Sequence, residues 1–326
     1  MRVAGVGCPR LQETVAVDFL VSRLPAHMRA PAWMIVACVA FAALWGFVRL
    51  ASETMHAFLV VFYRNLLGLL ILLPSVAAGG WAALATSRFG AHVRRATSGV
   101  IATFAVFYAV ANAPMATVMA INYTIPLFAT LAAILFLGER VRWRRIAALV
   151  VGFIGMLIVV RPGHVPLTPG IGAALLSAVA TAFSIIAMKQ LSRTESSLAI
   201  VTWSFVLMLP PSLLLALPYW KWPSGHELLV LAGVGLTAAI GQSGTVKAFA
   251  LAEATAVLPY DFVRFGLVIL IGTVGFGDPV DGFTYLGGAV ILCATIYIAH
   301  REAVAARSAR AGTASARLSA GASPEA

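Results

Sequence analysis

Charged side chains are scarce in this chain. Only 11% of its 326 residues are Asp, Glu, Lys or Arg, whereas 61% are hydrophobic. An average soluble domain carries about 25% charged residues, so this composition excludes an ordinary water-soluble enzyme or binding module. The mean hydropathy of +0.94 agrees with that exclusion. We therefore expect a protein of the lipid bilayer.

Metal-binding and nucleotide-binding motifs are also lacking. The 3 cysteines have no paired spacing, and the 6 histidines are scattered, so no metal site is predicted. No Gly-Lys-Ser or Gly-Lys-Thr loop is present to bind a phosphate, and no polar segment is long enough for a nucleotide-binding domain. The sequence therefore predicts no cofactor, and energy for any transport would come from a gradient.

Long apolar runs, by contrast, fill most of the chain. An untilted membrane helix needs about 20 apolar residues, and ten runs approach or reach that length. Five lie in the first half, at Ala32–Leu50, Ala57–Leu73, Thr97–Ala111, Ala116–Leu137 and Ile146–Val160. Five lie in the second half, at Ile171–Met188, Leu198–Leu217, Leu228–Val246, Ala254–Phe276 and Phe283–Ala299. The sequence therefore predicts an all-α integral membrane protein with ten transmembrane helices.

The two halves of the chain repeat one another. A shift of 139 positions aligns the halves and lays Asn122 on Asp261, Gly138 on Gly277 and Arg64 on Trp203. With five spans in each repeat, the second copy must have the opposite orientation in the membrane. Inverted repeats of this kind usually bind cargo at their interface, so the repeat favours a transporter.

Loop charges support an inverted pair with both termini in the cytoplasm. The turn before the fifth run is rich in arginine, whereas the equivalent turn before the tenth run has Asp278 and Asp281 and no Lys or Arg. In this orientation only Arg161 and Lys221 lie outside. Eighteen Lys and Arg lie inside: Arg2, Arg10, Arg23, Arg29, Arg88, Arg94, Arg95, Arg140, Arg142, Arg144, Arg145, Lys189, Arg193, Lys247, Arg301, Arg307, Arg310 and Arg317. The net charge of +11 is thus explained by topology, and no nucleic-acid partner is expected.

The two ends of the chain differ from its apolar body. Residues 1–31 show no signal peptide and are predicted as a cytoplasmic leader; Met28 offers an alternative start of translation, which would make the leader non-native. Residues 301–326 are rich in Ala, Ser, Gly and Arg, and we expect a disordered cytoplasmic tail. Between them, residues 32–162 and 170–300 form the first and second repeats.

Motifs at the end of the first repeat resemble those of a known family. The matching segments are Pro126-Leu127-Phe128, Gly138-Glu139-Arg140 and Val151-Gly152-Phe153-Ile154-Gly155. They resemble the EamA repeat of the drug/metabolite transporter superfamily. The segment from Ala248-Phe249 through Ala254-Thr255-Ala256 to Pro259-Tyr260 looks like that of the subgroup containing bacterial S-adenosylmethionine carriers. The second copy departs from the family pattern at Gly277-Asp278-Pro279.

This resemblance implies a fold and a mechanism. The fold would be two inverted five-helix EamA repeats in the bacterial inner membrane. The function would be secondary transport by alternating access, either coupled to protons or by exchange. Members of the superfamily carry amino acids, riboflavin, nucleotide sugars, amines and metal-chelating metabolites, so the family leaves the cargo open.

Polar residues within the apolar runs are the candidates for binding that cargo, because burying them in lipid is costly. They are Arg64, Asn122, Tyr123, Tyr260, Asp261 and Arg264. Repeat symmetry predicts Asn122 and Asp261 on opposite walls of one site. Asp261 would hold a cationic group or a proton, and the arginines Arg64 and Arg264 a carboxylate.

Each candidate also has a purely structural alternative. Asp261 and Arg264, spaced i and i+3 on a helix, would neutralise each other. Arg64 would extend toward the headgroups, and Asn122 would form a hydrogen bond between helices. Trp45 and Trp203 would either stack on a planar ligand or pack against lipid.

Two prolines are candidates for hinges. Pro126 and Pro259 interrupt backbone hydrogen bonding near the depth of Asn122 and Asp261. A structural kink in the helix is the alternative to a hinge.

The cargo best suited to these residues is a small polar or zwitterionic metabolite: S-adenosylmethionine, an amino acid or an amino-acid derivative. Riboflavin or a metallophore-type metabolite is the alternative. A membrane-embedded transferase with Asp261 as its base is a remote alternative function, because the sequence has no nucleophile and base at plausible spacing. We therefore expect no enzyme. Exact cargo, direction, coupling ion and the choice between monomer and homodimer stay open.

Overall fold

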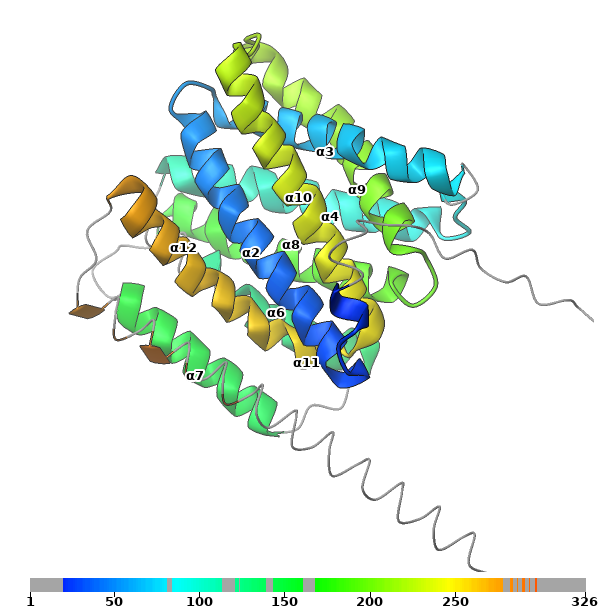
Figure 1. Cartoon of the computed structure of the whole chain (residues 1–326). Coiled ribbons are helices and arrows are strands. Elements are labelled where there is room, and N and C mark those ends of the chain that lie inside the picture. Colours follow the sequence, from blue (N-terminus) through cyan, green and yellow to red (C-terminus); the bar gives the residue numbers. More distant parts are fainter. Residues whose placement is uncertain are drawn as a thin grey trace, which may run out of the picture.

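The computed structural model describes residues 20–80, 84–112, 121–122, 124–138, 143–160 and 168–277, together with a few residues between 282 and 297. Within these residues every regular element is helical, and the helices form one bundle (Figure 1). The predicted all-α class is therefore confirmed.

The described helices follow the predicted apolar runs. The first half contains α2 (Ala26–Ser52), α3 (Ala57–Gly79), α4 (Phe89–Asn112), α6 (Ile125–Leu137) and α7 (Trp143–Val160). The second half contains α8 (Pro169–Leu191), α9 (Ser197–Ala216), η2 (Leu217–Tyr219), α10 (Gly225–Leu251), α11 (Ala254–Val257), η3 (Leu258–Asp261) and α12 (Phe262–Phe276). Five helices are long and apolar enough to cross a membrane: α2, α3, α8, α9 extended by η2, and α10. The tenth predicted span lies mostly outside the described residues.

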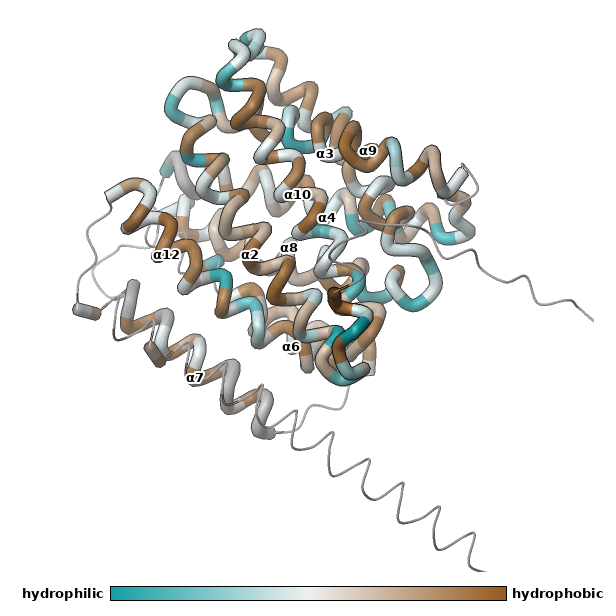
Figure 2. Tube along the Cα trace, in the orientation of Figure 1, coloured by the Kyte–Doolittle hydropathy of each residue, from teal (hydrophilic) through white to brown (hydrophobic). Residues whose placement is uncertain are grey.

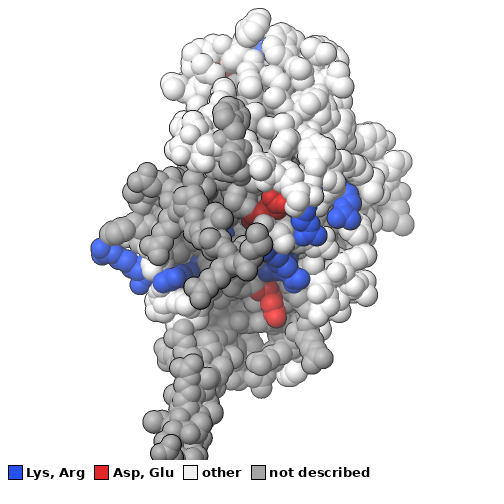
Figure 3. Space-filling view, turned by 90° about the vertical axis from the view of Figure 1, so that its right-hand side faces the viewer, with Lys and Arg blue, Asp and Glu red and all other residues white. Residues whose placement is uncertain are grey.

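The bundle surface is apolar over much of its area, as Figure 2 shows by the brown segments along α12, α10 and α9. Large side chains on these helices are turned outward, including Leu214 and Val274, which is 80% exposed. A soluble monomer rarely exposes apolar patches of this extent, whereas lipid solvates them. On the face shown in Figure 3, the described Lys and Arg side chains gather across the middle and leave the upper part nearly uncharged.

The core is built from helices of both halves. α10 packs along α2 and α3, α4 packs along α8, and α12 packs along α2. Glycines on α10 allow this close approach. A Cβ atom at Gly235 would lie 2.7 Å from the Cβ of Leu67 and 2.9 Å from the backbone nitrogen of Gly68. The position of α3 on α10 therefore requires glycine at residue 235.

The interval of 139 residues also appears in the backbone. α6 ends at Gly138 with φ 65°, and α12 ends at Gly277 with φ 66°. Both residues cap their helices in the left-handed conformation, where glycine has no steric penalty from a Cβ atom. Equivalent positions of the two halves thus end equivalent helices in the same way.

Two predicted spans are not continuous helices. The span predicted at Ala254–Phe276 is divided into α11, η3 and α12, and Pro259 lies in the 3₁₀ segment. The span predicted at Ala116–Leu137 has a turn at Thr124, after which α6 begins with Pro126 in its first turn. The apolar pattern is uninterrupted at both places, but proline supplies no N–H for a helical hydrogen bond and is best tolerated at a helix start.

The first helix extends into the predicted leader. α2 begins at Ala26, and Ala30 is buried in the core. Arg29 donates hydrogen bonds to the carbonyl oxygens of Ser22 and Leu24 just before the helix. Pro31 lies inside α2 and supplies no N–H for a helical hydrogen bond.

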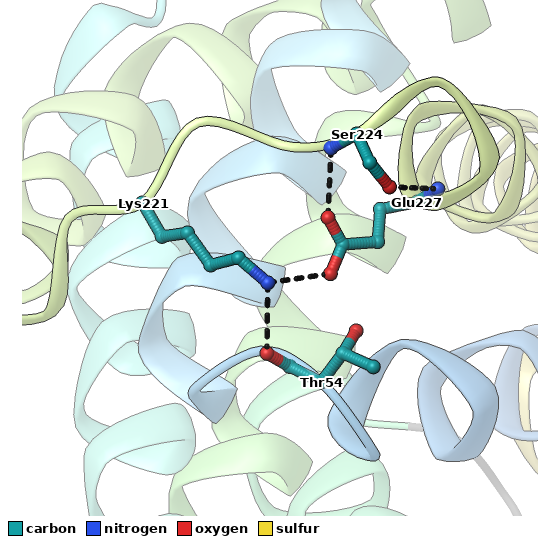
Figure 4. Close-up of polar contacts among 4 residues, drawn as sticks. All are labelled: Thr54, Lys221, Ser224 and Glu227. Carbon is teal, nitrogen blue, oxygen red and sulfur yellow. Dashed lines mark hydrogen bonds and ion pairs between the residues drawn. The ribbon is translucent and has the colours of Figure 1, made fainter.

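At the opposite end of α2, a polar cluster joins two turns (Figure 4). Ser224 and Glu227 form a capping box that starts α10. Lys221 lies 2.7 Å from the Oε1 of Glu227 and also donates to the carbonyl oxygen of Thr54 at 3.4 Å. The turn before α10 is thereby attached to the turn between α2 and α3.

Candidate functional site

Asp261 and Arg264 form an ion pair at the break between η3 and α12. The Nη2 of Arg264 donates to the Oδ2 of Asp261 at 2.6 Å, and the two side chains are only 22% and 13% exposed, respectively. Asp261 is the N-cap residue of α12, so Arg264 lies one turn further along the same helix face. The geometry is that of mutual neutralisation, and both charged groups remain partly accessible.

Helix α2 covers this break from the other half of the chain. The Sγ of Cys38 donates to the carbonyl oxygen of Tyr260 at 3.4 Å and lies 4.0 Å from the Oδ1 of Asp261. The guanidinium carbon of Arg264 lies 5.7 Å from the centre of the Phe41 ring. Tyr260, Asp261 and Arg264 thus lie at a contact between the two halves; their role in binding cargo stays a prediction.

Asn122 lies in the neighbouring part of the first half. It is half-buried and directly precedes the turn into α6, and α6 packs against η3. The structure therefore brings α6, which begins shortly after Asn122, against η3, which contains Asp261. Tyr123 lies outside the described residues. The paired role predicted for Asn122 and Asp261 stays a prediction.

Arg64 belongs to a different region. It projects from α3 between the helices, and its Nε is buried without a hydrogen-bond partner in the described part of the chain. The carboxylate-binding roles predicted for Arg64 and Arg264 stay predictions.

Arg95 is a buried residue that sequence reasoning placed among the loop charges. Its side chain is 5% exposed. Its Nη1 donates to the carbonyl oxygen of Ile200 at 3.0 Å, and its Nη2 donates to the Oε1 of Gln242 at 2.7 Å and to the sulfur of Met188 at 3.5 Å. Arg95 thus connects α4 to α8, α9 and α10, and its Nε remains without a partner.

The misassignment of Arg95 has a clear cause. The apolar run was predicted to begin at Thr97, but α4 begins at Phe89. Continuing the helix backward would have placed His92 and Arg95 at the spacing of the buried positions Ala102, Ala105 and Ala109, which is the signal that the prediction missed. Gln242, its partner, is a polar residue within the predicted span Leu228–Val246, and that position is the signal that the candidate list missed.

Two other charges counted at the inner side also have structural partners. Lys189 is buried and donates to the carbonyl oxygens of Phe249 and Ala252 at the C-terminal end of α10. A cation at that end satisfies free carbonyl groups and complements the helix dipole. The Nζ of Lys247 lies 4.3 Å from the centre of the Trp33 ring. These lysines therefore stabilise helix contacts as well as contributing to the charge balance.

The two tryptophans do not lie together at the Asp261 pair. The indole nitrogen of Trp203 donates to the carbonyl oxygen of Leu84 at 3.0 Å, and its ring meets Phe89 edge-on at 5.3 Å. Trp203 therefore holds the segment that leads into α4. Trp45 lies on α2 and is 40% exposed. Its predicted stacking on a ligand is untested, as are the hinge roles of Pro126 and Pro259.

Among the residues that the structure describes, no group of three or more His, Cys, Asp or Glu is arranged to hold a metal ion. The Asp261 pair offers both signs of charge, whereas Arg64 and Arg95 each carry a positive charge.

Comparisons with known proteins agree with this architecture. The profile of the EamA-like transporter family matches residues 28–161 and again residues 168–299. The S-adenosylmethionine uptake transporter of Rickettsia felis is 29% identical over 279 residues, which cover 86% of this chain and 95% of that protein. The riboflavin transporter of Vibrio cholerae is 32% identical over 85% of this chain and 95% of its own length. A crystal structure of another protein superposes with a TM-score of 0.68 over 81% of this chain and 96% of that chain; at 19% identity it shows the fold alone.

Proposed function

Since this chain belongs to the EamA-like transporter family and is a multi-pass metabolite transporter of the bacterial inner membrane, we propose that its cargo is S-adenosylmethionine or a related amino-acid derivative. The observation that carries this choice is the partly accessible Asp261–Arg264 ion pair at a helix break. S-adenosylmethionine has an ammonium and a sulfonium group as well as a carboxylate. A zwitterion of this kind can replace each member of the ion pair as the partner of the other.

Energetics favour such an exchange of partners. Separating a buried ion pair without replacement leaves two uncompensated charges and is strongly unfavourable. A zwitterionic cargo supplies both replacements at once, whereas a neutral molecule supplies neither. Asp261 would then bind the cationic groups of the cargo and Arg264 would be released to its carboxylate. The same carboxylate of Asp261, when unpaired, would provide a place for a coupled proton.

The mechanism we propose is alternating access between two inverted five-helix repeats, residues 32–162 and 170–300, with both termini cytoplasmic. The 3₁₀ segment Leu258–Asp261 supports this proposal, because short 3₁₀ stretches within helices often mark hinges. Pro259 would act as the hinge in the second repeat, and Pro126, at the start of α6, in the first. Asn122 and Tyr123 would approach the cargo from the α6 side, opposite Tyr260.

Riboflavin is the second candidate, supported by the identity to the Vibrio cholerae protein. Its planar ring system would stack on an aromatic side chain, and the exposed Trp45 is suited to that contact. Riboflavin carries no carboxylate or ammonium group, so it would leave the Asp261 pair intact. The two candidates thus make different demands on Asp261 and Arg264.

Proteoliposomes provide the test. Purified protein would first be screened by thermal shift, because a compound that binds the folded state raises its melting temperature. Uptake of labelled S-adenosylmethionine and of riboflavin would then be measured with and without a pH gradient and with internal unlabelled cargo. Saturable movement of S-adenosylmethionine that excess riboflavin does not inhibit is expected. Movement of riboflavin alone would reject the first candidate in favour of the second.

A further inference from the structure

Helices α3 and α9 pack against each other and run in opposite directions. The turn that leads into α3 contacts the turn that follows α9. At the other end, the segment that follows α3 contacts the turn that leads into α9. Because α3 belongs to the first half of the chain and α9 to the second, polar contacts join the two halves at both ends of this helix pair.

The contacts at the start of α3 form the outer cluster, which consists of Thr54, His56, Tyr219, Lys221 and Glu227. Lys221 is held by its ion pair with Glu227 and donates to the carbonyl oxygen of Thr54 in the other half at 3.4 Å (Figure 4). The ring of His56 stacks on that of Tyr219, and the ring centres lie 3.6 Å apart. The side chain of Lys221 is 50% exposed, so water reaches this cluster.

The contacts at the other end form the inner cluster, which consists of Thr86, Arg88, Thr194 and Glu195. The hydroxyl of Thr86 accepts a hydrogen bond from the backbone N–H of Arg88 at 2.9 Å and donates to the Oε1 of Glu195 at 2.9 Å. The Nη1 of Arg88 donates to the hydroxyl of Thr194 at 3.2 Å. Arg88 and Thr194 are exposed, so water reaches this cluster as well.

Repeat symmetry relates the two clusters. The shift of 139 residues lays His56 on Glu195 and Arg88 on Glu227. Each cluster therefore joins the turn before one of the two helices to the segment after the other. Inverted repeats place equivalent features at opposite membrane surfaces. In the proposed orientation the outer cluster faces the outside and the inner cluster faces the cytoplasm.

Between the clusters, α3 and α9 make a close apolar contact. A Cβ atom at Gly68 would lie 2.8 Å from the ring of Phe205, and that ring is fully buried. Gly68 lies at the middle of the 23 residues of α3, and Phe205 lies near the middle of the 20 residues of α9. The helix pair therefore has a tightly packed apolar middle and two polar ends that are open to solvent.

The contacts at the ends and in the middle differ in what it costs to break them. Water replaces the hydrogen bonds that are broken at an exposed surface, and exposed ion pairs contribute little to stability. Separating Phe205 from Gly68 would instead leave a void in the packed core, where no other atoms replace the lost contacts. A tilt of α3 on α9 that keeps the middle contact can therefore separate one end at small cost.

We infer that the outer and inner clusters are the two gates of the transporter, which open in turn as α3 tilts on α9 about the Gly68–Phe205 contact. This inference rests on the proposed alternating-access function and names the residues that close each end. Both clusters are formed in the structure, so α3 and α9 are joined at both ends. Breaking the outer cluster would admit cargo from outside, and breaking the inner cluster would open the path to the cytoplasm.

Paired cysteines that can be cross-linked test the two gates. The outer pair is His56→Cys with Tyr219→Cys, and the inner pair is Thr86→Cys with Glu195→Cys. Closing either pair with a short, reducible thiol cross-linker should stop uptake of labelled S-adenosylmethionine into proteoliposomes, because one gate can no longer open. A reducing agent should restore uptake. Binding of the labelled compound to the protein in detergent should persist with one pair closed and be lost when both pairs are closed.

The native cysteines would first be removed by Cys8→Ala, Cys38→Ser and Cys293→Ala; the substitution Cys38→Ser keeps a hydrogen-bond donor at this buried position. The matched control pair is Arg94→Cys with Ser98→Cys. Ser98 donates to the carbonyl oxygen of Arg94 at 3.0 Å within α4, so a cross-link between these positions joins no two helices. Closing the control pair should leave uptake unchanged.

Two results would overturn the gates while leaving the transporter intact. Uptake that continues after the outer or the inner pair has been cross-linked would show that the contact does not open during transport. Loss of binding with only one pair closed would show that the opposite end does not open independently.

Failure of the proposed cargo would be recognised separately. Absence of S-adenosylmethionine uptake before any cross-linking would reject that cargo, and the same pairs would then be tested with riboflavin. If neither compound moves, thiol labelling decides. Closing the outer pair in a variant that also carries Glu195→Cys should speed the reaction of this cysteine with a water-soluble maleimide, because the inner gate is then the one that opens. An unchanged rate would overturn the gates.

Discussion

The bundle contains two charged regions that differ in how their charge is balanced. At the start of α12, Arg264 has Asp261 as its counter-ion at 2.6 Å. In the second region, Arg95 of α4 is buried and donates to the neutral groups of Ile200 and Gln242. The first region is an ion pair, whereas the hydrogen bonds that the structure describes for Arg95 go to uncharged groups.

The difference in charge balance predicts how the stability of each region responds to substitution. Removing one member of a satisfied pair creates an uncompensated charge, so the loss is large. The Nε of Arg64 has no hydrogen-bond partner in the described part of the chain, so replacing Arg64 breaks no described bond at that atom. The loss of stability should therefore be large at Asp261 and Arg264 and small at Arg64.

The largest effect is expected for Asp261→Asn. The variant leaves the guanidinium of Arg264 without its carboxylate, and breaking a buried pair in this way costs about 3–5 kcal/mol. Thermal unfolding in detergent would measure this loss of stability. Arg264→Gln and the double variant would complete a double-mutant cycle. The double variant should recover part of the stability. Strictly additive losses would show that the two side chains do not act as a pair.

Next in size is the contrast between Arg95→Gln and Arg64→Gln. Arg95→Gln loses charged hydrogen bonds to Ile200 and Gln242, each worth about 1.5–3 kcal/mol. Arg64→Gln removes a side chain whose buried Nε has no hydrogen-bond partner in the described part of the chain, so stability should change less than in Arg95→Gln. Melting temperatures without cargo would compare the two. A large destabilisation by Arg64→Gln would indicate a structural role and weaken the comparison.

Gly235→Ala should have an intermediate effect. The new methyl group would meet Leu67 and the backbone of Gly68 and push α3 away from α10, which costs about 1–3 kcal/mol. Because α3 carries Arg64 and α10 carries Gln242, which accepts a hydrogen bond from Arg95, the helix packing around these side chains should also be weakened. Gly172→Ala on α8 is the control, since nothing lies within 4 Å of its added Cβ. Equal melting temperatures for the two variants would contradict the proposed close packing.

The smallest effect is expected for Trp203→Phe. Trp203 occupies the position equivalent to Arg64 in the other repeat, but its indole donates to Leu84. Loss of that bond should cost about 0.5–1.5 kcal/mol and leave the transport rate and cargo preference unchanged. A selective loss of transport, with normal melting temperature, would instead place Trp203 in the cargo site.

Local sequence patterns were sufficient to predict most of the helices and the charged region formed by Asp261 and Arg264. The apolar runs predicted α3 and α9 closely, and Gly138 and Gly277 were found by the repeat interval before their left-handed conformation was known. Asp261 and Arg264 lie on neighbouring positions of one helix face, so their pairing depends on a spacing of three residues. Contacts of this kind are set within a single turn.

Contacts between segments that are distant in the sequence were not predicted. The partners of Arg95 come from α8, α9 and α10, and those of Lys189 from the end of α10. In the sequence both residues looked like ordinary inner-side charges near helix ends. In the structure both side chains are buried and donate hydrogen bonds to other helices. Their burial depends on which helices pack together.

The sequence by itself determined the membrane class, the repeat and the polar residues that must avoid lipid, because hydrophobicity and helical periodicity act along the chain. Tertiary structure alone decided which of the other charges are buried and what they contact. It placed Arg95 against groups of α8, α9 and α10 and Lys189 against the end of α10, since the energy of a buried charge depends on every helix that surrounds it.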